Sequence, residues 1–313
     1  MDHDDVIRGW EELEEILSNY DIKIDAARFV RVSIDSSEVR DKLFWLKPEN
    51  CDAFFNRLDP NDLNWLEDHP LSADFHIEFT KDFDDDSWCE VQFVERLLEQ
   101  IFLVLNVAVR GGCNYGSFRI GKAWKSLHCS DIESGWHYSS VNEWPVIERL
   151  SVIKTWQWFE KFSKFDFILA DTAVTKASAV LLHLAYKDDI ESTDILQLSQ
   201  VIENFYLVNG EPKARGLNRK IPVVLGRLPD SNKKLIQNFY KLRSDIAHGD
   251  FPLFRPRYRE TDAGFEAVEK HYWEISQEVD KGIALVIATL QFLVRNGAER
   301  MVFKEEISVE TNG

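Results

Sequence analysis

The sequence has little cysteine, only two methionines and no long apolar run. Its four cysteines (Cys51, Cys89, Cys113 and Cys129) show no close pairing in 313 residues, which indicates reduced thiols rather than a disulfide framework. The longest apolar run, around Ile101–Val109, is too short to cross a bilayer. The chain does not begin with the charged and then apolar stretch that is typical of a secretory signal peptide. We therefore expect a cytoplasmic protein that does not associate with a membrane.

Sequence motifs for several common chemistries are also missing. There is no Walker lysine, no Rossmann glycine fingerprint and no Gly-x-Ser-x-Gly elbow. Cys113, His128, Cys129 and His137 lack the paired spacing of zinc ligands, so buried thiols and incidental histidines are the favoured interpretation. The acidic run Asp82–Asp86 lacks the glycine and final glutamate of an EF-hand loop. The sequence thus predicts no metal ion and no cofactor.

What the chain does have is acidic charge, unevenly distributed. The formal net charge is −17, and residues 1–100 account for all of it, with 27 Asp/Glu against 10 Lys/Arg. Residues 101–313 are neutral, with 27 of each. Within 211–260 there are 12 Lys/Arg and 5 Asp/Glu, a local excess of +7. A polyanion would be repelled by the first third and attracted to this segment.

The basic segment has two interpretations. Lys233 and Lys241 are candidate RNA-binding residues, because cations on one segment attract phosphates. The alternative is that Lys233, Lys234 and Lys241 form an ordinary solvated helix face. Charge alone does not separate the two.

Hydrophobic periodicity predicts an α+β protein in which a mixed part precedes a helical part. Alternation over Arg28–Ile34 and Asp74–Thr80 predicts strands, whereas 130–144 has the glycine and aromatic content of a loop. From Pro145 onward the apolar residues have helical spacing. We expect an acidic α/β domain of unknown role over 1–144, a helical bundle over 145–298 and a tail over 299–313. The helices expected are Glu11–Leu17, Ser87–Val109, Val146–Phe162, Phe165–Tyr186, Ser192–Leu207, Leu217–Leu225, one from Pro229 to the motif described next, and Gly264–Val294.

The most informative stretch is Tyr240–Gly249, which reads Tyr-Lys-Leu-Arg-Ser-Asp-Ile-Ala-His-Gly. Arg243 provides a planar fork of donors that suits phosphate, and His248 transfers protons near neutral pH. Residues five apart lie about 140° around a helix axis, so the two do not share one face. Either His248 bends back where the helix ends, with Gly249 as a left-handed cap, or two copies meet across a two-fold axis.

The arrangement of the helical part resembles a known superfamily. Leu198–Tyr206, then Arg219–Gly226, then Phe239–Gly249 form a succession similar to the Apea-like branch of HEPN domains (higher eukaryotes and prokaryotes nucleotide-binding). The resemblance covers roughly 145–298. Arg-x4-His alone is a weak signal, but Tyr-x-Leu-Arg-Ser-x-x-x-His-Gly after this helical spacing is a stronger one.

The resemblance implies a metal-independent endoribonuclease that acts as a homodimer through its bundle, in a toxin or anti-phage defence role. His248 would be the general acid or base in attack of a ribose 2′-hydroxyl on the adjacent phosphate. Arg243 would stabilise the charge that develops on that phosphate. The family often has Asn, Asp or His after the arginine, where this chain has Ser244. Ser244 would donate one hydrogen bond, and Asp245 would orient His248.

Two further possibilities remain open at the level of sequence. Arg255, Arg257 and Arg259 alternate with aromatic residues after the motif, a pattern that suits single-stranded RNA or an exposed loop equally well. The competing function is a non-catalytic dimerisation module, in which His248 and Gly249 merely end a helix. In either case the acidic N-terminal part would bind a protein partner or respond to a trigger.

Overall fold

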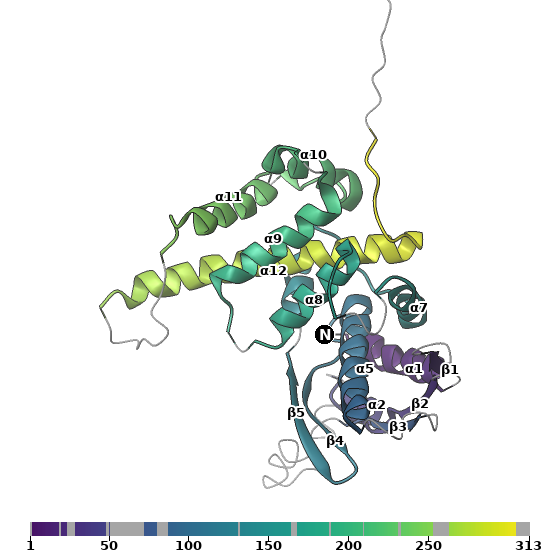
Figure 1. Ribbon diagram of the computed structural model, residues 1–313. Helices are drawn as coiled ribbons and strands as arrows, with labels where there is room; N and C mark the ends of the chain where they lie inside the picture. Colours follow the sequence, from purple (N-terminus) through teal and green to yellow (C-terminus); the bar gives the residue numbers. More distant parts are fainter. Residues whose placement is uncertain are drawn as a thin grey trace, which may run out of the picture.

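The computed structural model describes residues 2–18, 20–23, 29–47, 50, 72–79, 87–130, 132–163, 168–187, 189–208, 210–230, 233–252 and 263–304. Helices form most of it, with two small antiparallel sheets, which confirms the predicted α+β class (Figure 1). None of its described helices has the length and apolar character needed to cross a bilayer.

The N-terminal part packs a helix on a three-stranded sheet. The sheet has the order β1-β2-β3 with antiparallel pairing, and alternate side chains of its central strand (Val30, Val32 and Ile34) are buried. Helix α1 covers it with Val6, Trp10, Leu13 and Leu17 at helical spacing. The elements are α1 (His3–Leu17), β1 (Tyr20–Lys23), β2 (Phe29–Asp35), α2 (Ser37–Trp45) and β3 (Asp74–Phe79).

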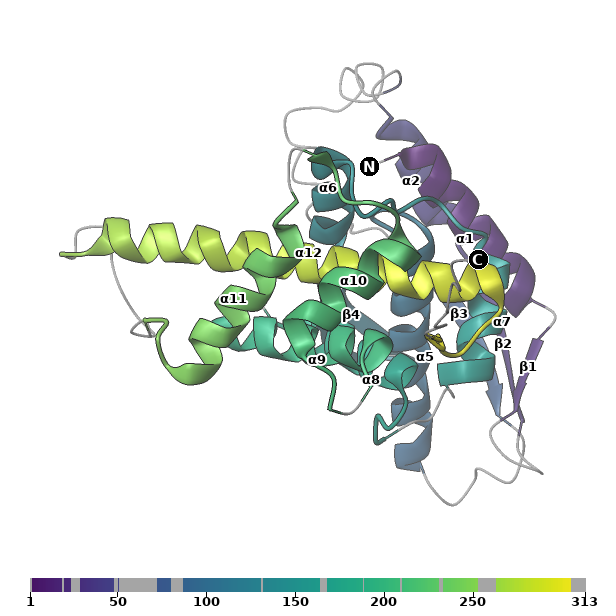
Figure 2. The same ribbon diagram turned by 90° about the horizontal axis from the view of Figure 1, so that it is seen from above.

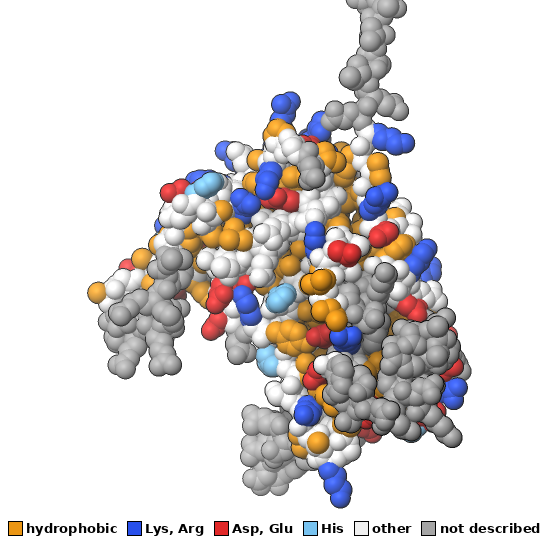
Figure 3. Space-filling view, in the orientation of Figure 1, with side chains coloured by type: hydrophobic (Ala, Val, Ile, Leu, Met, Phe, Trp, Pro, Cys, Tyr) orange, Lys and Arg blue, Asp and Glu red, His pale blue; other side chains and the backbone are white. Residues whose placement is uncertain are grey.

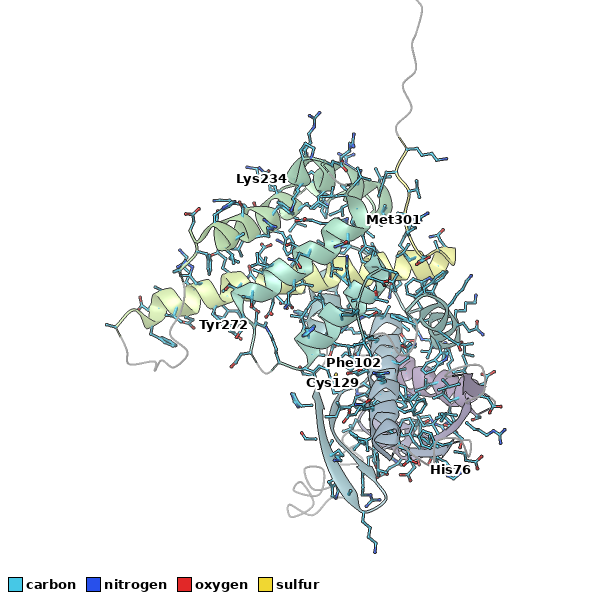
Figure 4. The ribbon with its side chains drawn as sticks, in the orientation of Figure 1. His76, Phe102, Cys129, Lys234, Tyr272 and Met301 are labelled. Atoms are coloured by element: carbon cyan, nitrogen blue, oxygen red, sulfur yellow. The ribbon has the colours of Figure 1, made fainter. Side chains whose placement is uncertain are left out.

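A long apolar helix, α5 (Ser87–Ala108), leads from this part to a two-stranded hairpin. The hairpin consists of β4 (Tyr115–Ile120) and β5 (Ala123–Cys129), joined by Gly121 at φ +57 and Lys122. Figure 1 shows it extending downward from the body of the molecule. Figure 4 labels Phe102 of α5 and Cys129 of β5 at its attached end, where the ring centroids of Phe102 and Tyr115 are 6.5 Å apart.

The helical part is organised around its last helix. Figure 2 shows α12 as a straight rod that crosses the molecule, with the other helices of this part packed along it. Its first buried residue is Ile275, and almost every residue from Lys281 to Leu293 is buried. The elements are α6 (Glu133–Asn142), α7 (Val152–Ser163), α8 (Ala173–Ala185), α9 (Ser192–Tyr206), α10 (Lys213–Leu225), α11 (Leu235–His248) and α12 (Phe265–Asn296).

One continuous hydrophobic core joins the two parts. Gln291 of α12 is fully buried, and its amide donates to the carbonyls of Val107 and Glu148, both at 2.8 Å. Its carbonyl accepts from the N–H of Glu148 at 3.1 Å. One side chain thereby connects α5, α12 and the segment before α7. The predicted boundary at 144/145 is accordingly crossed by buried contacts.

Helix α7 begins six residues later than predicted because a distant carboxylate caps it. Glu12 of α1 accepts from the N–H of Val152 at 2.6 Å, from the hydroxyl of Ser151 at 2.8 Å and from Arg149 at 2.7 Å. Burial raises the pKa of Glu12, but these bonds outweigh burial, so its pKa lies below the ordinary value. Residues 146–151 are therefore not helical, unlike the predicted Val146–Phe162.

Other predicted elements also need correction. The stretch 130–144 is not simply a loop, because it contains α6. Gly135 allows α6 to approach α12 closely, since a Cβ there would lie 2.6 Å from a side-chain carbon of Ile283. The predicted helix Phe165–Tyr186 begins only at Ala173, capped by Thr172. The hairpin strand β5 was not predicted.

Candidate functional site

The motif occupies the C-terminal half of α11. One face of this helix is buried through Leu235, Ile236, Phe239, Tyr240 and Leu242. Gly249 has φ 80 and takes the left-handed cap position, as predicted. The N–H of Asp250 donates to the carbonyl of Asp245 at 2.8 Å, which closes the helix end.

Arg243 turns toward α9 rather than toward His248. Its Nε donates to the hydroxyl of Ser199 at 3.4 Å, and its Nη2 lies 3.7 Å from Oε1 of Glu203. The guanidinium carbon is 5.7 Å from the centre of the Tyr240 ring. The Arg243 side chain is 21% exposed, so one edge of its fork is held by α9 while the side chain still reaches the surface. Its Nη1 makes no hydrogen bond or ion pair with any residue that the structure describes.

Glu203 is the centre of a cluster that joins α9, α10 and α11. It accepts a short hydrogen bond from the Tyr240 hydroxyl, and its Oε2 lies 2.7 Å from Nζ of Lys213. Burial and this hydrogen bond to a carboxylate raise the pKa of Tyr240 well above its ordinary value. Glu203 is only 14% exposed, so its charge is compensated by neighbours rather than by water.

The other predicted catalytic residues lie at the helix end. His248 is exposed, whereas Ser244 and Asp245 are half-buried. Among the described residues, none of these three side chains makes a hydrogen bond or ion pair, so the orientation of His248 by Asp245 stays a prediction. Arg243 and His248 share one helix, yet the contacts of Arg243 with α9 turn it away from the helix end.

The predicted RNA-binding residues divide into three groups. Lys233 is exposed and pairs with Asp230 at 3.1 Å. Lys241 is exposed and has no ion pair within the described part of the chain. Arg255, Arg257 and Arg259 lie outside the described residues.

Several cations of the basic segment pair with acids in the folded chain. Glu211 is 12% exposed and pairs with both Lys220 and Arg219, the latter at 3.2 Å. Lys220 is buried, so its charge is directed inward. Asp230 pairs with Arg227 at 3.5 Å as well as with Lys233. Glu211 and Asp230 are already counted in the +7 excess, whereas Glu203 lies outside 211–260 and pairs with two cations of the segment, Lys213 and Arg243.

Glu203 and Ser199 are the site residues that the sequence did not predict. They lie one helical turn apart on α9, so they present their side chains to the same neighbour. The available signal was this i, i+4 spacing of a hydroxyl and a carboxylate in a helix that precedes the motif. That signal does not specify which arginine the pair contacts.

The described residues form no metal site at the motif. No group of three or more His, Cys, Asp or Glu could hold a metal ion within that part of the chain. Cys113 and Cys129 are buried free thiols, and burial raises the pKa of both. A pocket of about 450 Å³ lies between α1, α6 and 146–149, and no residue of the motif lines it.

Comparisons with models of known protein families, with curated proteins and with solved structures give no match to this chain. The likeness to Apea-like HEPN domains therefore depends on the residues quoted from the sequence.

Proposed function

We propose that the protein is a metal-independent endoribonuclease of the HEPN type that acts as a homodimer. The proposal rests on the presence of two functional groups on α11, the imidazole of His248 and the guanidinium of Arg243. His248 is exposed at the end of α11, and Arg243, five residues earlier, contacts Ser199 and Glu203 on α9. An exposed imidazole supplies proton transfer, and a guanidinium whose Nη1 contacts no described residue supplies charge for a phosphate.

The geometry favours a site shared between two copies. Within one chain Arg243 is directed at α9 and His248 lies about 140° away around the axis of α11. A two-fold axis beside the end of α11 would bring a second Arg243 and a second His248 to the same phosphate. In this arrangement Glu203 and Ser199 act as positioning residues, since they fix the fork of Arg243 before substrate arrives.

The reaction needs no bound metal in this scheme. His248 takes the proton of a ribose 2′-hydroxyl, whose oxygen attacks the adjacent phosphorus. The bond to the 5′-oxygen breaks, a proton is delivered to that oxygen, and a 2′,3′-cyclic phosphate remains. Arg243 stabilises the additional negative charge on the phosphate during the attack.

The test is incubation of the purified protein with total RNA in EDTA. His248→Ala is expected to lower the cleavage rate by roughly 10²–10⁴-fold, because general acid–base catalysis is lost. Arg243→Ala is expected to lower it by about 10²-fold or more. His183→Ala and Arg300→Ala are matched controls, since both residues are exposed and lie outside the motif. Product ends are identified as 2′,3′-cyclic phosphates by their resistance to ligation until opened.

Sedimentation tests the shared site. An active species is expected at twice the 36.5 kDa chain mass. Full activity from a monomer would contradict the composite arrangement.

The second candidate function is the non-catalytic bundle. Its supporting observation is the Glu203 cluster, in which Arg243 joins α9 to α11 as a structural ion pair. Absence of cleavage in the parent, or equal cleavage by the parent and both motif variants, would favour this role over the nuclease.

A further inference from the structure

The β4–β5 hairpin carries cationic and aromatic side chains, and its cations have no acidic partner in the part of the chain that the structure describes. The sequence has no Asp or Glu between Glu99 and Asp131, although the whole chain contains 54. Arg119, Lys122 and Lys125 are exposed, and none forms an ion pair with a residue in the described ranges. In Figure 3 the projecting lower end of the hairpin shows blue and orange side chains.

The strand register places Trp124 and Arg119 on the same face of the hairpin. Arg119 lies directly opposite Trp124, and Ser117 lies opposite Ser126 two residues further along. Because side chains alternate across a ribbon, these four share one face. All four are exposed, Trp124 to 67%. The guanidinium carbon of Arg119 is 5.6 Å from the centre of the Trp124 ring, so a positive charge lies over one face of that ring.

The attached end of the hairpin is fixed in the body of the protein. Cys129 is buried, and the N–H of Ser130 donates to the carbonyl of Ala185 in α8 at 2.7 Å. A two-stranded ribbon is marginally stable alone, so these contacts give a firm base to an exposed tip. Such an exposed tryptophan contributes nothing to the core, and its exposure carries a hydration cost.

We propose that this hairpin is a binding arm for single-stranded RNA, with a base stacked on Trp124 and phosphates contacted by Arg119 beside it, by Lys122 at the turn and by Lys125 on the opposite face. Every base has a flat π-face, and stacking on an aromatic ring is the usual way to hold an unpaired base. Three exposed cations, with no ion pair to any described residue, supply electrostatic attraction for the RNA backbone in a protein of net charge −17. The choice of RNA over DNA rests on the proposed nuclease function.

The arm is separate from the motif. Figure 1 shows the hairpin at the lower end of the molecule and α11 at the upper end. A bound RNA strand would therefore contact the arm with nucleotides other than those at His248. The arm sets affinity for the strand, whereas His248 acts on one phosphate.

The experiment measures RNA binding by the full chain carrying His248→Ala, so that cleavage does not interfere. A fluorescein-labelled, unstructured RNA is titrated and its anisotropy recorded. Trp124→Ala is expected to weaken binding roughly 5- to 150-fold, and Trp124→Phe to retain most of the affinity. Lys122→Ala with Lys125→Ala is expected to reduce the slope of log K against log salt by about 1.4.

Matched controls use equally exposed residues elsewhere. Trp273, 57% exposed on α12, tests whether any surface tryptophan matters, and Lys154→Ala with Lys161→Ala on α7 tests general charge. Equal losses in these controls would overturn the proposal. It would also fail if dependence on Trp124 appeared with single-stranded DNA but not RNA, or if polyglutamate competed with RNA in a Trp124-dependent manner.

The outcomes separate this inference from the proposed function. If the parent does not cleave RNA but Trp124 governs RNA binding, the nuclease proposal fails and the arm stands. If the parent cleaves and the hairpin variants bind RNA as it does, the arm fails and the nuclease stands.

Discussion

Two basic regions of this acidic protein differ in how far their cations are paired with carboxylates. Around α10 and α11 several cations pair with carboxylates of low exposure: Glu203 contacts Arg243 and Lys213, and Glu211 contacts Lys220. Lys241 has no such partner among the described residues. On the β4–β5 hairpin, Lys122 and its basic neighbours meet no carboxylate among the described residues. The first region is the more basic in sequence, yet the second exposes its charge more completely.

The difference shows that a count of charges along a chain does not locate a phosphate-binding surface. A cation that is paired at low exposure is already neutralised, and loss of its partner destabilises the fold. A cation on an exposed ribbon costs the fold little and keeps its full attraction for a polyanion. The two regions should accordingly respond differently to substitution.

The largest expected difference comes from charge reversal. Glu203→Lys places a third cation beside Arg243 and Lys213 at a site of 14% exposure, and is expected to cost about 3–5 kcal/mol of unfolding free energy. Lys122→Glu at the hairpin tip is expected to change that free energy by less than about 0.5 kcal/mol. Urea unfolding of both variants measures the contrast. Similar costs would show that the two regions do not differ in this way.

A middle-sized effect is expected from the Tyr240 hydroxyl. Tyr240→Phe removes its hydrogen bond to Glu203 and is expected to cost about 1.5–3 kcal/mol. The pKa of Tyr240 is higher in the folded chain than in the unfolded chain, so its contribution is complete below about pH 10 and is lost as pH rises further.

The pH dependence provides the check for this residue. The fall in unfolding free energy between neutral and strongly alkaline pH should be smaller in Tyr240→Phe than in the parent. Trp124→Ala, on the hairpin, should leave that fall unchanged. An identical fall in the parent and Tyr240→Phe would contradict the assigned role of the cluster.

The smallest expected effect concerns the hairpin turn. Gly121 has φ +57, so Gly121→Ala is expected to cost about 1 kcal/mol locally. Gly116→Ala is the matched control, because its Cβ would meet nothing within 4 Å and its φ is not positive. Amide hydrogen exchange should speed up over 115–129 in the first variant alone. Faster exchange throughout the bundle would indicate that the arm is not an independent unit.

The sequence predicted those elements whose local signals agree with their burial. Helices α9, α11 and α12 have apolar residues at helical spacing, and Gly249 and Gly297 end the last two in left-handed geometry. Helix α6 was missed because its apolar residues follow no helical period. It is stabilised instead by tertiary contacts, such as the 2.8 Å bond from the Trp136 indole to the carbonyl of Asn106.

The site was only partly predictable for the same reason. Arg243, His248 and the cap at Gly249 are local in sequence, so a motif contains them. The contact of Arg243 with Glu203 joins residues 40 positions apart, and only the packing of α9 against α11 selects that carboxylate. The hairpin's cation–aromatic contact likewise requires the strand register that puts Arg119 opposite Trp124.

The buried amide of Gln291 has a consequence for modularity. Its three hydrogen bonds reach Val107 of α5 and Glu148, so the Gln291 side chain contacts residues on both sides of the predicted boundary at 144/145. A fragment starting at Pro145 would lose α5, and with it the carbonyl of Val107 and the apolar surface that covers α12. The helical part is thus not an independent module. If it were fused to another protein without α5, the apolar surface of α12 that α5 covers would be exposed.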